Sequence, residues 1–369
     1  MKILMSLIVM GVSFFTYAKA PQVAIDACES QVAGNSCSFS SPRNTVEGIC
    51  RQPPSQKQLV CVPERGAANG LSGNQLSDAG SSNASGQVQR RAPRKHTAIQ
   101  SDGKIEMLEA NVEPITDNEI SVRVEGDVRI LVANGVSEHL TGQFPNSGNP
   151  NEIKEQSYTF NIPANPKVAK EITPLGLHDF GLGLNGVPFD PIAAEWYLGD
   201  RNSGWQYEAM SGAVELGLDE NHAHVQPTGA YHYHALPTLL VSRLHLSSEE
   251  YSPLIGWAAD GFPIYALYGY KDPEDKHSDI VEQTSSYQLK SGHRPEGGSN
   301  PGGHYDGTFV ADYEYVEGAG SLDECNGQST ITPEFPNGTY AYFLTDTFPV
   351  IPRCYKGTPS TDFTQQRAR

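Results

Sequence analysis

The sequence predicts a β-rich protein, either all-β or α+β with few helices, with a small disulfide-rich N-terminal module and an antiparallel sandwich or barrel-like main domain. The 369 residues contain 36 Gly and 26 Pro, a composition that favours many turns between short strands. Several segments alternate apolar and polar residues, whereas only residues 235–251 resemble a helix of any length. The chain is long enough for roughly two domains.

The N-terminal twenty residues have the features of a secretory signal peptide. Lys2 precedes an apolar run over residues 3–15, and Ala18-Lys19-Ala20 forms a small-residue cleavage pattern. A membrane anchor is the alternative, but the run is short for a span and no second apolar stretch of about 20 residues follows. We therefore expect cleavage after residue 20, a secreted or periplasmic protein, and no integral membrane segment in the mature chain.

Export makes the six cysteines candidates for disulfides. Four of them, in a predicted module at residues 24–64, can form two bridges in any of three pairings, and a zinc site is disfavoured because no pair has the usual close spacing. The remaining two are expected to pair with each other. The first group is Cys28, Cys37, Cys50 and Cys61, and the second is Cys325 and Cys354.

Residues 65–97 are rich in Gly, Ser, Ala, Asn and Gln and predict a flexible linker. The main domain is assigned to residues 98–369. It opens with a predicted hairpin in which a three-residue turn at residues 125–127 pairs Val124 with Val128 and Ile120 with Val132. Alternation at Tyr158, Phe160 and Ile162 and the apolar run at residues 340–344 predict two further strands.

Four of the eleven histidines fall within thirteen residues, as two His-x-His pairs on either side of Pro227-Thr228-Gly229. Residues i and i+2 of a strand share a face, and Pro-Thr-Gly suits a three-residue hairpin loop that ends with Gly in the left-handed conformation. The resulting register places His224 opposite His232 and His222 opposite His234. All four imidazoles would then lie on one face, with Tyr231 and Tyr233 on the other.

Clustered neutral imidazoles suit copper, zinc, iron(II) or nickel better than hard cations such as calcium. Buried, hydrogen-bonded histidines are the structural alternative. The paired spacing favours one metal ion, with three of the four histidines as ligands more readily than all four. Copper is favoured by the exported location, and zinc becomes the better candidate if an acid completes the site.

Seven short motifs occur in order along the main domain. They are Asn185-Gly186-Val187-Pro188-Phe189, His222-Ala223-His224, Tyr231-His232-Tyr233-His234, Ala259-Asp260-Gly261-Phe262-Pro263-Ile264-Tyr265, Asp306-Gly307-Thr308-Phe309, Leu322-Asp323-Glu324-Cys325-Asn326-Gly327 and Phe348-Pro349-Val350-Ile351-Pro352-Arg353-Cys354. With these motifs the chain resembles the YHYH-domain family of secreted, mostly bacterial proteins. The resemblance covers about residues 100–357 and implies an exported protein with one shared site.

Two of these motifs place an acid beside a turn. Asp260 and Glu324 are candidate catalytic groups that could lie within one water of the metal as ligand or general base, although turn-stabilising roles are the alternative. The same two roles, at the metal or in a turn, are open to Asp219 and Glu220, which directly precede the first histidine pair.

A net charge of −17 repels phosphate backbones, so no nucleic-acid partner is expected. Motifs of serine hydrolases, zincins and phosphate loops are absent from the sequence. Three functions remain. The first is a metalloenzyme, such as a metal-dependent hydrolase or oxidoreductase, that acts on a small molecule or polysaccharide. The second is copper or zinc sequestration without catalysis, and the third is a carbohydrate or surface-binding module with structural histidines, whose stacking platform would be formed by Trp196, Tyr197, Trp205 and Tyr207. Of these three functions, we expect the metalloenzyme.

Overall fold

The computed structural model describes residues 22–29, 31–32, 35–40, 45–51, 58–63 and 105–365. The chain divides into two compact units, Met1–Arg90 and Arg91–Arg369. The predicted signal peptide and the predicted linker lie outside the described residues. Among the residues that are described, no helix is both long and apolar enough to cross a membrane.

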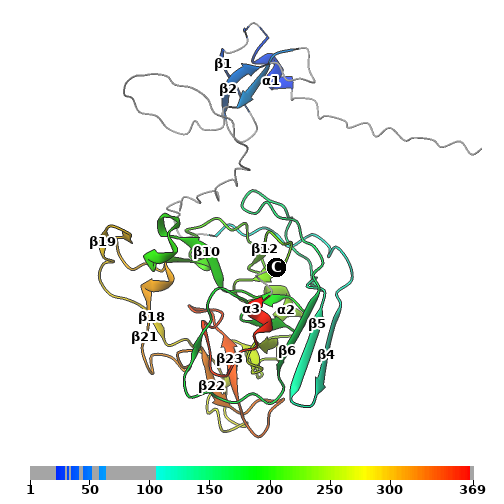
Figure 1. Cartoon of the computed structure of the whole chain (residues 1–369), viewed down its shortest axis with the longest axis vertical. Helices are drawn as coiled ribbons and strands as arrows, with labels where there is room; N and C mark the ends of the chain where they lie inside the picture. Colours follow the sequence, from blue (N-terminus) through cyan, green and yellow to red (C-terminus); the bar gives the residue numbers. More distant parts are fainter. Residues whose placement is uncertain are drawn as a thin grey trace, which may run out of the picture. The chain divides into compact units, whose positions relative to one another are not determined.

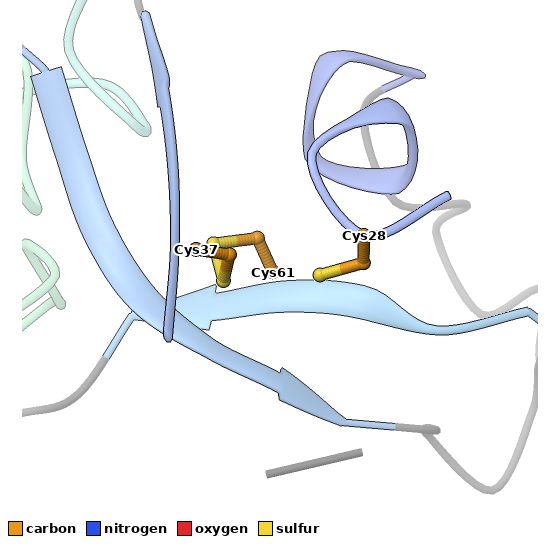
Figure 2. A group of neighbouring side chains, drawn as sticks. All are labelled: Cys28, Cys37 and Cys61. Carbon is orange, nitrogen blue, oxygen red and sulfur yellow. A yellow bond between two sulfur atoms is a disulfide. The ribbon is translucent and has the colours of Figure 1, made fainter. Parts of the chain in front are cut away.

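The first unit contains a small antiparallel sheet stapled by two disulfides. Cys28 bonds Cys50 and Cys37 bonds Cys61, which selects one of the three pairings that the sequence left open. Figure 2 shows the side chains of Cys28, Cys37 and Cys61 grouped near the helix and strands. Because these cysteines are all oxidised, they provide no thiolate for a zinc ion. The elements are α1 (Gln22–Asp26), β1 (Ser36–Ser40), β2 (Thr45–Arg51) and β3 (Val60–Pro63), in the sheet order β1-β2-β3.

An eight-stranded sheet forms the centre of the second unit (Figure 1). Its pairings are antiparallel except between β13 and β9 and between β15 and β23, so the sheet is mixed where the sequence predicted antiparallel strands. The predicted strand at residues 340–344 is confirmed as β23, which is buried on both faces. In sheet order the strands are β12 (Ala223–Val225), β13 (Tyr231–Tyr233), β9 (Pro188–Phe189), β8 (Gly181–Gly183), β14 (Gly256–Ala258), β15 (Pro263–Ala266), β23 (Thr339–Leu344) and β22 (Gly327–Thr330).

A second sheet contains β4 (Ile120–Glu125), β5 (Val128–Ala133) and β6 (Tyr158–Pro163), seen side by side in Figure 1. The apolar positions of β6 are buried, as the alternation predicted, and Phe160 stacks on Phe363 of helix α3 (Asp362–Gln365) with ring centroids 4.0 Å apart.

The predicted register of the first hairpin is wrong by one residue. Glu125 pairs with Val128 and Ile120 with Ala133, because the turn contains two residues rather than three, with Gly126 at a φ of 61°. A two-residue turn matches the right-handed twist of the strands, and glycine adopts positive φ without steric cost. The even-numbered valines of β4 are exposed, while Leu131 of β5 is buried.

The predicted helix at residues 235–251 is much shorter than expected. Helix α2 spans Thr238–Arg243, and His245 at a φ of 59° follows its end.

Trp205 and Tyr207, which were candidates for a sugar platform, are buried and pack around Phe309. Short elements complete the unit: the pairs β10 (Ile192–Trp196) with β11 (Gln206–Glu208), β16 (Tyr268–Tyr270) with β17 (Ile280–Glu282), β18 (Tyr287–Leu289) with β21 (Tyr313–Tyr315), β19 (Glu296–Gly297) with β20 (Asn300–Pro301) and β24 (Cys354–Tyr355) with β7 (Thr173–Pro174), and the 3-10 helices η1 (Tyr197–Gly199), η2 (Arg201–Ser203), η3 (Ala209–Ser211) and η4 (Val310–Asp312).

The predicted bridge between Cys325 and Cys354 is confirmed. It connects the loop before β22 to β24 across a sequence separation of 29 residues. By the chain-entropy model, a loop of this length stabilises the fold by roughly 3–4 kcal/mol. The bridge therefore anchors Arg353 and its neighbours to the central sheet.

Candidate metal centre

The histidine hairpin forms as the sequence predicted. β12 and β13 pair antiparallel with His224 opposite His232, and the His234 N–H donates to the His222 carbonyl at 2.8 Å. The Gly229 N–H closes the turn on the Gln226 carbonyl at 2.8 Å, and Gly229 has a φ of 91°. This turn fixes the register that brings the two His-x-His pairs together.

The two tyrosines between the histidines point into the core and are tied there by short hydrogen bonds. The Tyr231 hydroxyl donates to Asp219 at 2.6 Å. The Tyr233 hydroxyl lies 2.6 Å from Nε2 of His139 and accepts from the Asn185 amide at 2.8 Å. Both tyrosines are fully buried, so they hold the strand in place while its other face presents imidazoles.

Three imidazoles converge on that other face. Nε2 of His234 lies 3.0 Å from Nε2 of His232 and 3.0 Å from Nε2 of His224. These are the three residues of the main domain's described part whose ligand atoms could hold a metal, all within 4.8 Å of one another. His232 and His234 are buried, and His224 is partly exposed.

Backbone carbonyls set the tautomers of two of these rings. Nδ1 of His224 lies 2.8 Å from the Leu216 oxygen, and Nδ1 of His232 lies 3.2 Å from the Ala230 oxygen. A carbonyl accepts but never donates, so the proton belongs on Nδ1 and the lone pair on Nε2. Both rings therefore direct a ligand nitrogen toward His234.

The protein alone does not satisfy this arrangement. One proton on Nε2 of His234 cannot serve two good hydrogen bonds at once, and Nδ1 of His234 is buried without a partner among the described residues. A tetrahedral metal ion about 2.0–2.1 Å from each nitrogen would separate the nitrogens by about 3.3–3.4 Å, close to the observed spacing. The three residues thus fit a metal through their Nε2 atoms.

Burial keeps the three rings neutral, which is the form that binds metals. It lowers the pKa of His224 to about 4. The pKa of His232 is well below its usual value because of burial and the charge of His224. The pKa of His234 is also far lowered, first by burial, then by the two other imidazoles and by Arg353.

His222 does not join the group, although the sequence placed it with the other three. It precedes the first residue of β12 and has a φ of 54°, so its side chain departs from the strand pattern. Its Nδ1 lies 2.7 Å from the Leu236 carbonyl. The alternation of side chains ends where the extended backbone ends, and only three of the four histidines remain on the shared face.

Asp219 holds the loop that enters β12. This buried carboxylate accepts hydrogen bonds from the backbone N–H groups of Gly142 at 2.8 Å and Asn221 at 2.9 Å, besides the Tyr231 hydroxyl. The role is structural. The neighbouring Glu220 accepts from the Ala110 N–H at 3.1 Å.

The two predicted catalytic acids make other contacts. Buried Asp260 accepts from the Tyr342 hydroxyl at 2.6 Å and from the Gly357 N–H at 2.8 Å. Burial raises its pKa, and those hydrogen bonds partly oppose the rise. Glu324 pairs with Lys356 at 3.1 Å. Neither acid belongs to the group of candidate ligands around the histidines.

An ion pair that the sequence analysis missed acts on this region. Nη2 of Arg353 lies 2.6 Å from Oε2 of Glu208, and both side chains are largely buried. The charge of Arg353 is among those that lower the pKa of His234. Arg353 stands in one of the quoted motifs, but nothing near Glu208 in the sequence signals a partner 145 residues away.

A family model described as YHYH protein matches residues 159–357, which is more than half of the chain. The matched region contains the three clustered histidines, Asp260 and Arg353, whereas β4 and β5 precede it. No curated protein and no solved structure matches the chain.

Proposed function

The chain belongs to the YHYH protein family, and we propose that it is an exported protein that binds one transition-metal ion through His224, His232 and His234. The observation that carries this proposal is the convergence of three Nε2 atoms, two of them forced to present lone pairs by carbonyl contacts at Nδ1. The three disulfides are consistent with an oxidising compartment.

Copper or zinc is the proposed ion, because both bind neutral imidazole readily. Three protein ligands leave a coordination position for water or substrate, which is typical of catalytic rather than structural sites. A metal in such a site polarises a bound oxygen or activates water. We therefore favour a metalloenzyme, either a hydrolase or an oxidoreductase.

Sequestration without catalysis is the second candidate. It is favoured by the absence of any carboxylate from the ligand group within the described residues and by the occupied contacts of Asp260 and Glu324. For either acid to act as a base, it would have to give up the hydrogen bonds or the ion pair it makes. We accordingly assign Asp260 a supporting role in the fold.

Metal binding is tested by elemental analysis of the mature protein purified without a histidine tag. We expect one equivalent of copper or zinc in the wild type and a loss in the double variant His232→Ala/His234→Ala. The matched control is His222→Ala, which removes a histidine of the same motif that lies outside the cluster and should retain the metal. Equal metal content in all three proteins, or none in the wild type, would contradict the proposal.

The two candidate functions differ in whether the metal has a free position. Adding azide to the copper(II)-loaded or cobalt(II)-loaded protein should change its visible absorption spectrum if a position is open. An unchanged spectrum at saturating azide would favour the closed coordination of a sequestering protein.

A further inference from the structure

A cavity of about 330 Å³ is formed by the chain that precedes β12 and by two other segments of the same unit. Its lining comes from residues 105–108, from residues 146–147 and from residues 209–218. None of these residues is one of the candidate metal ligands. The volume is within the range of small-molecule sites in proteins.

Most of the cavity wall is apolar. The buried wall residues belong to one hydrophobic cluster, and they are Ala209, Val214, Leu216 and Leu218. Ile105, from another segment of the lining, packs against the same cluster. The cavity can therefore bury an apolar group of a ligand, and the burial of apolar surface is the main favourable contribution to such binding.

Hydrogen bonds between the three segments hold the wall in place. The Leu108 N–H donates to the Leu218 carbonyl at 2.9 Å, and the Asn146 side-chain amide donates to the Gly217 carbonyl at 3.1 Å. Gly217, at a φ of 64°, approaches Asn146 so closely that a Cβ there would clash with its Oδ1. A wall that is already ordered costs a ligand less entropy on binding.

The charged side chains of the lining are both acidic. Glu106 and Glu215 line the cavity and are exposed, and the lining contains no Lys, Arg or His. Carboxylates beside an apolar cavity attract a positive group and repel an anion, and the net charge of −17 acts in the same direction. The lining thus favours a ligand that combines an apolar body with a cationic group.

One wall residue also contacts the candidate metal centre. Leu216 lines the cavity, and its carbonyl accepts from Nδ1 of His224 at 2.8 Å. A ligand in the cavity would be separated from that imidazole by one residue. The cavity is therefore a neighbour of the metal centre rather than a part of it.

We propose that this cavity binds a small amphiphilic cation, with its apolar body against the buried wall and its ammonium group at the carboxylates of Glu106 and Glu215. The apolar wall supplies most of the affinity, because exposed ion pairs contribute little. The two carboxylates supply the preference for a cation over a neutral or anionic molecule of the same size.

The test is isothermal titration calorimetry of the mature chain, freed of metal with a chelator, against three probes with the same six-carbon chain: hexylammonium, hexanol and hexanoate. We expect hexylammonium to bind about 5-fold more tightly than hexanol, with hexanoate the weakest. Added salt should reduce this difference, because it screens exposed charges. Equal affinities for the three probes, or no binding of hexylammonium, would overturn the proposal.

Two pairs of substitutions assign the preference to this cavity. Glu106→Lys/Glu215→Lys should reverse the order, so that hexanoate binds more tightly than hexylammonium. The matched control is Glu113→Lys/Glu152→Lys, which makes the same change in net charge at two exposed acids outside the lining and should keep the wild-type order. A reversal in the control as well, or no reversal in the first variant, would contradict the assignment.

A neutral variant covers the case in which the reversed pair does not fold. Glu106→Gln/Glu215→Gln keeps the shape of both side chains and should bind hexylammonium and hexanol equally; an undiminished preference for hexylammonium would reject the role of the two carboxylates. Because the titrations use metal-free protein, they do not depend on the proposed function. Binding of hexylammonium by a protein that never holds metal would retain the cavity site and reject the metal centre, whereas a full equivalent of metal without hexylammonium binding would do the reverse.

Discussion

Replacing Tyr231 with Phe removes one hydroxyl from the core face of the histidine hairpin. The hydroxyl donates to Asp219 at 2.6 Å in a fully buried contact. Asp219 keeps the N–H groups of Gly142 and Asn221, so the carboxylate is not left without donors. We expect the variant to fold with an intact but less stable hairpin.

The expected loss in the free energy of unfolding follows from the kind of bond. A hydrogen bond to a charged group contributes about 1.5–3 kcal/mol, and the remaining donors place this case near the lower end, about 1.5–2 kcal/mol. In a domain of this size each kcal/mol corresponds to about 2–4 °C, so the denaturation midpoint should fall by about 3–8 °C.

Urea denaturation followed by circular dichroism measures the loss, and elemental analysis checks the metal. The matched control is Tyr315→Phe, on a partly exposed strand, whose hydroxyl makes no hydrogen bond within the described residues and whose loss should change stability little. Wild-type stability in Tyr231→Phe, or loss of metal without loss of stability, would refute the conclusion that Tyr231 is a structural anchor.

Three further predictions concern the surroundings of the site. Asp260→Asn replaces the carboxylate that accepts from the Tyr342 hydroxyl with an amide, which has one acceptor oxygen and one donor nitrogen. The free energy of unfolding measured in urea should fall by about 1.5–3 kcal/mol while the metal content stays unchanged. A loss of metal at unchanged stability would indicate that Asp260 is a metal ligand. Burial lowers the pKa of His139, so the stability that its neutral ring contributes is full above the unfolded pKa of about 6.5 and is lost as the pH falls from there through the folded pKa. In the metal-free protein, His139→Gln should therefore make the free energy of unfolding depend less on pH below about 6.5. An unchanged pH dependence would contradict the conclusion that His139 is buried in its neutral form. Gly229→Ala should cost about 1–3 kcal/mol in the same urea assay, because the residue has a φ of 91° and a Cβ there would lie 2.6 Å from Cβ of Lys154; a neutral effect would mean that the turn is not needed in this form.

Local chemistry made the hairpin predictable. The two-residue spacing within each His-x-His pair and the Pro-Thr-Gly turn between them specify which residues oppose one another, and the structure has that register. The cysteine bridge was predictable for a similar reason, because the other four cysteines are clustered near the N-terminus. The family also followed from short ordered motifs.

The first hairpin shows the limit of such reasoning. The alternation correctly located both strands, but it did not identify their buried positions, since Val122 and Val124 are exposed and Leu131 is buried. The turn length could not be read from Glu125-Gly126-Asp127, and a difference of one residue shifts every pairing. Two-residue and three-residue turns are both compatible with a central glycine, so these three residues alone do not fix the register.

By itself the sequence determined the β-rich class, the histidine hairpin and the residues available to bind a metal, because these depend on alternation and turn geometry within about fifteen positions. Only the tertiary structure decided that His222 turns away from the other three histidines, that Asp260 accepts a hydrogen bond from Tyr342, and that Arg353 forms an ion pair with Glu208. Those contacts join segments up to 145 residues apart, and burial and hydrogen-bond competition, rather than spacing, select among the side chains that a sequence offers.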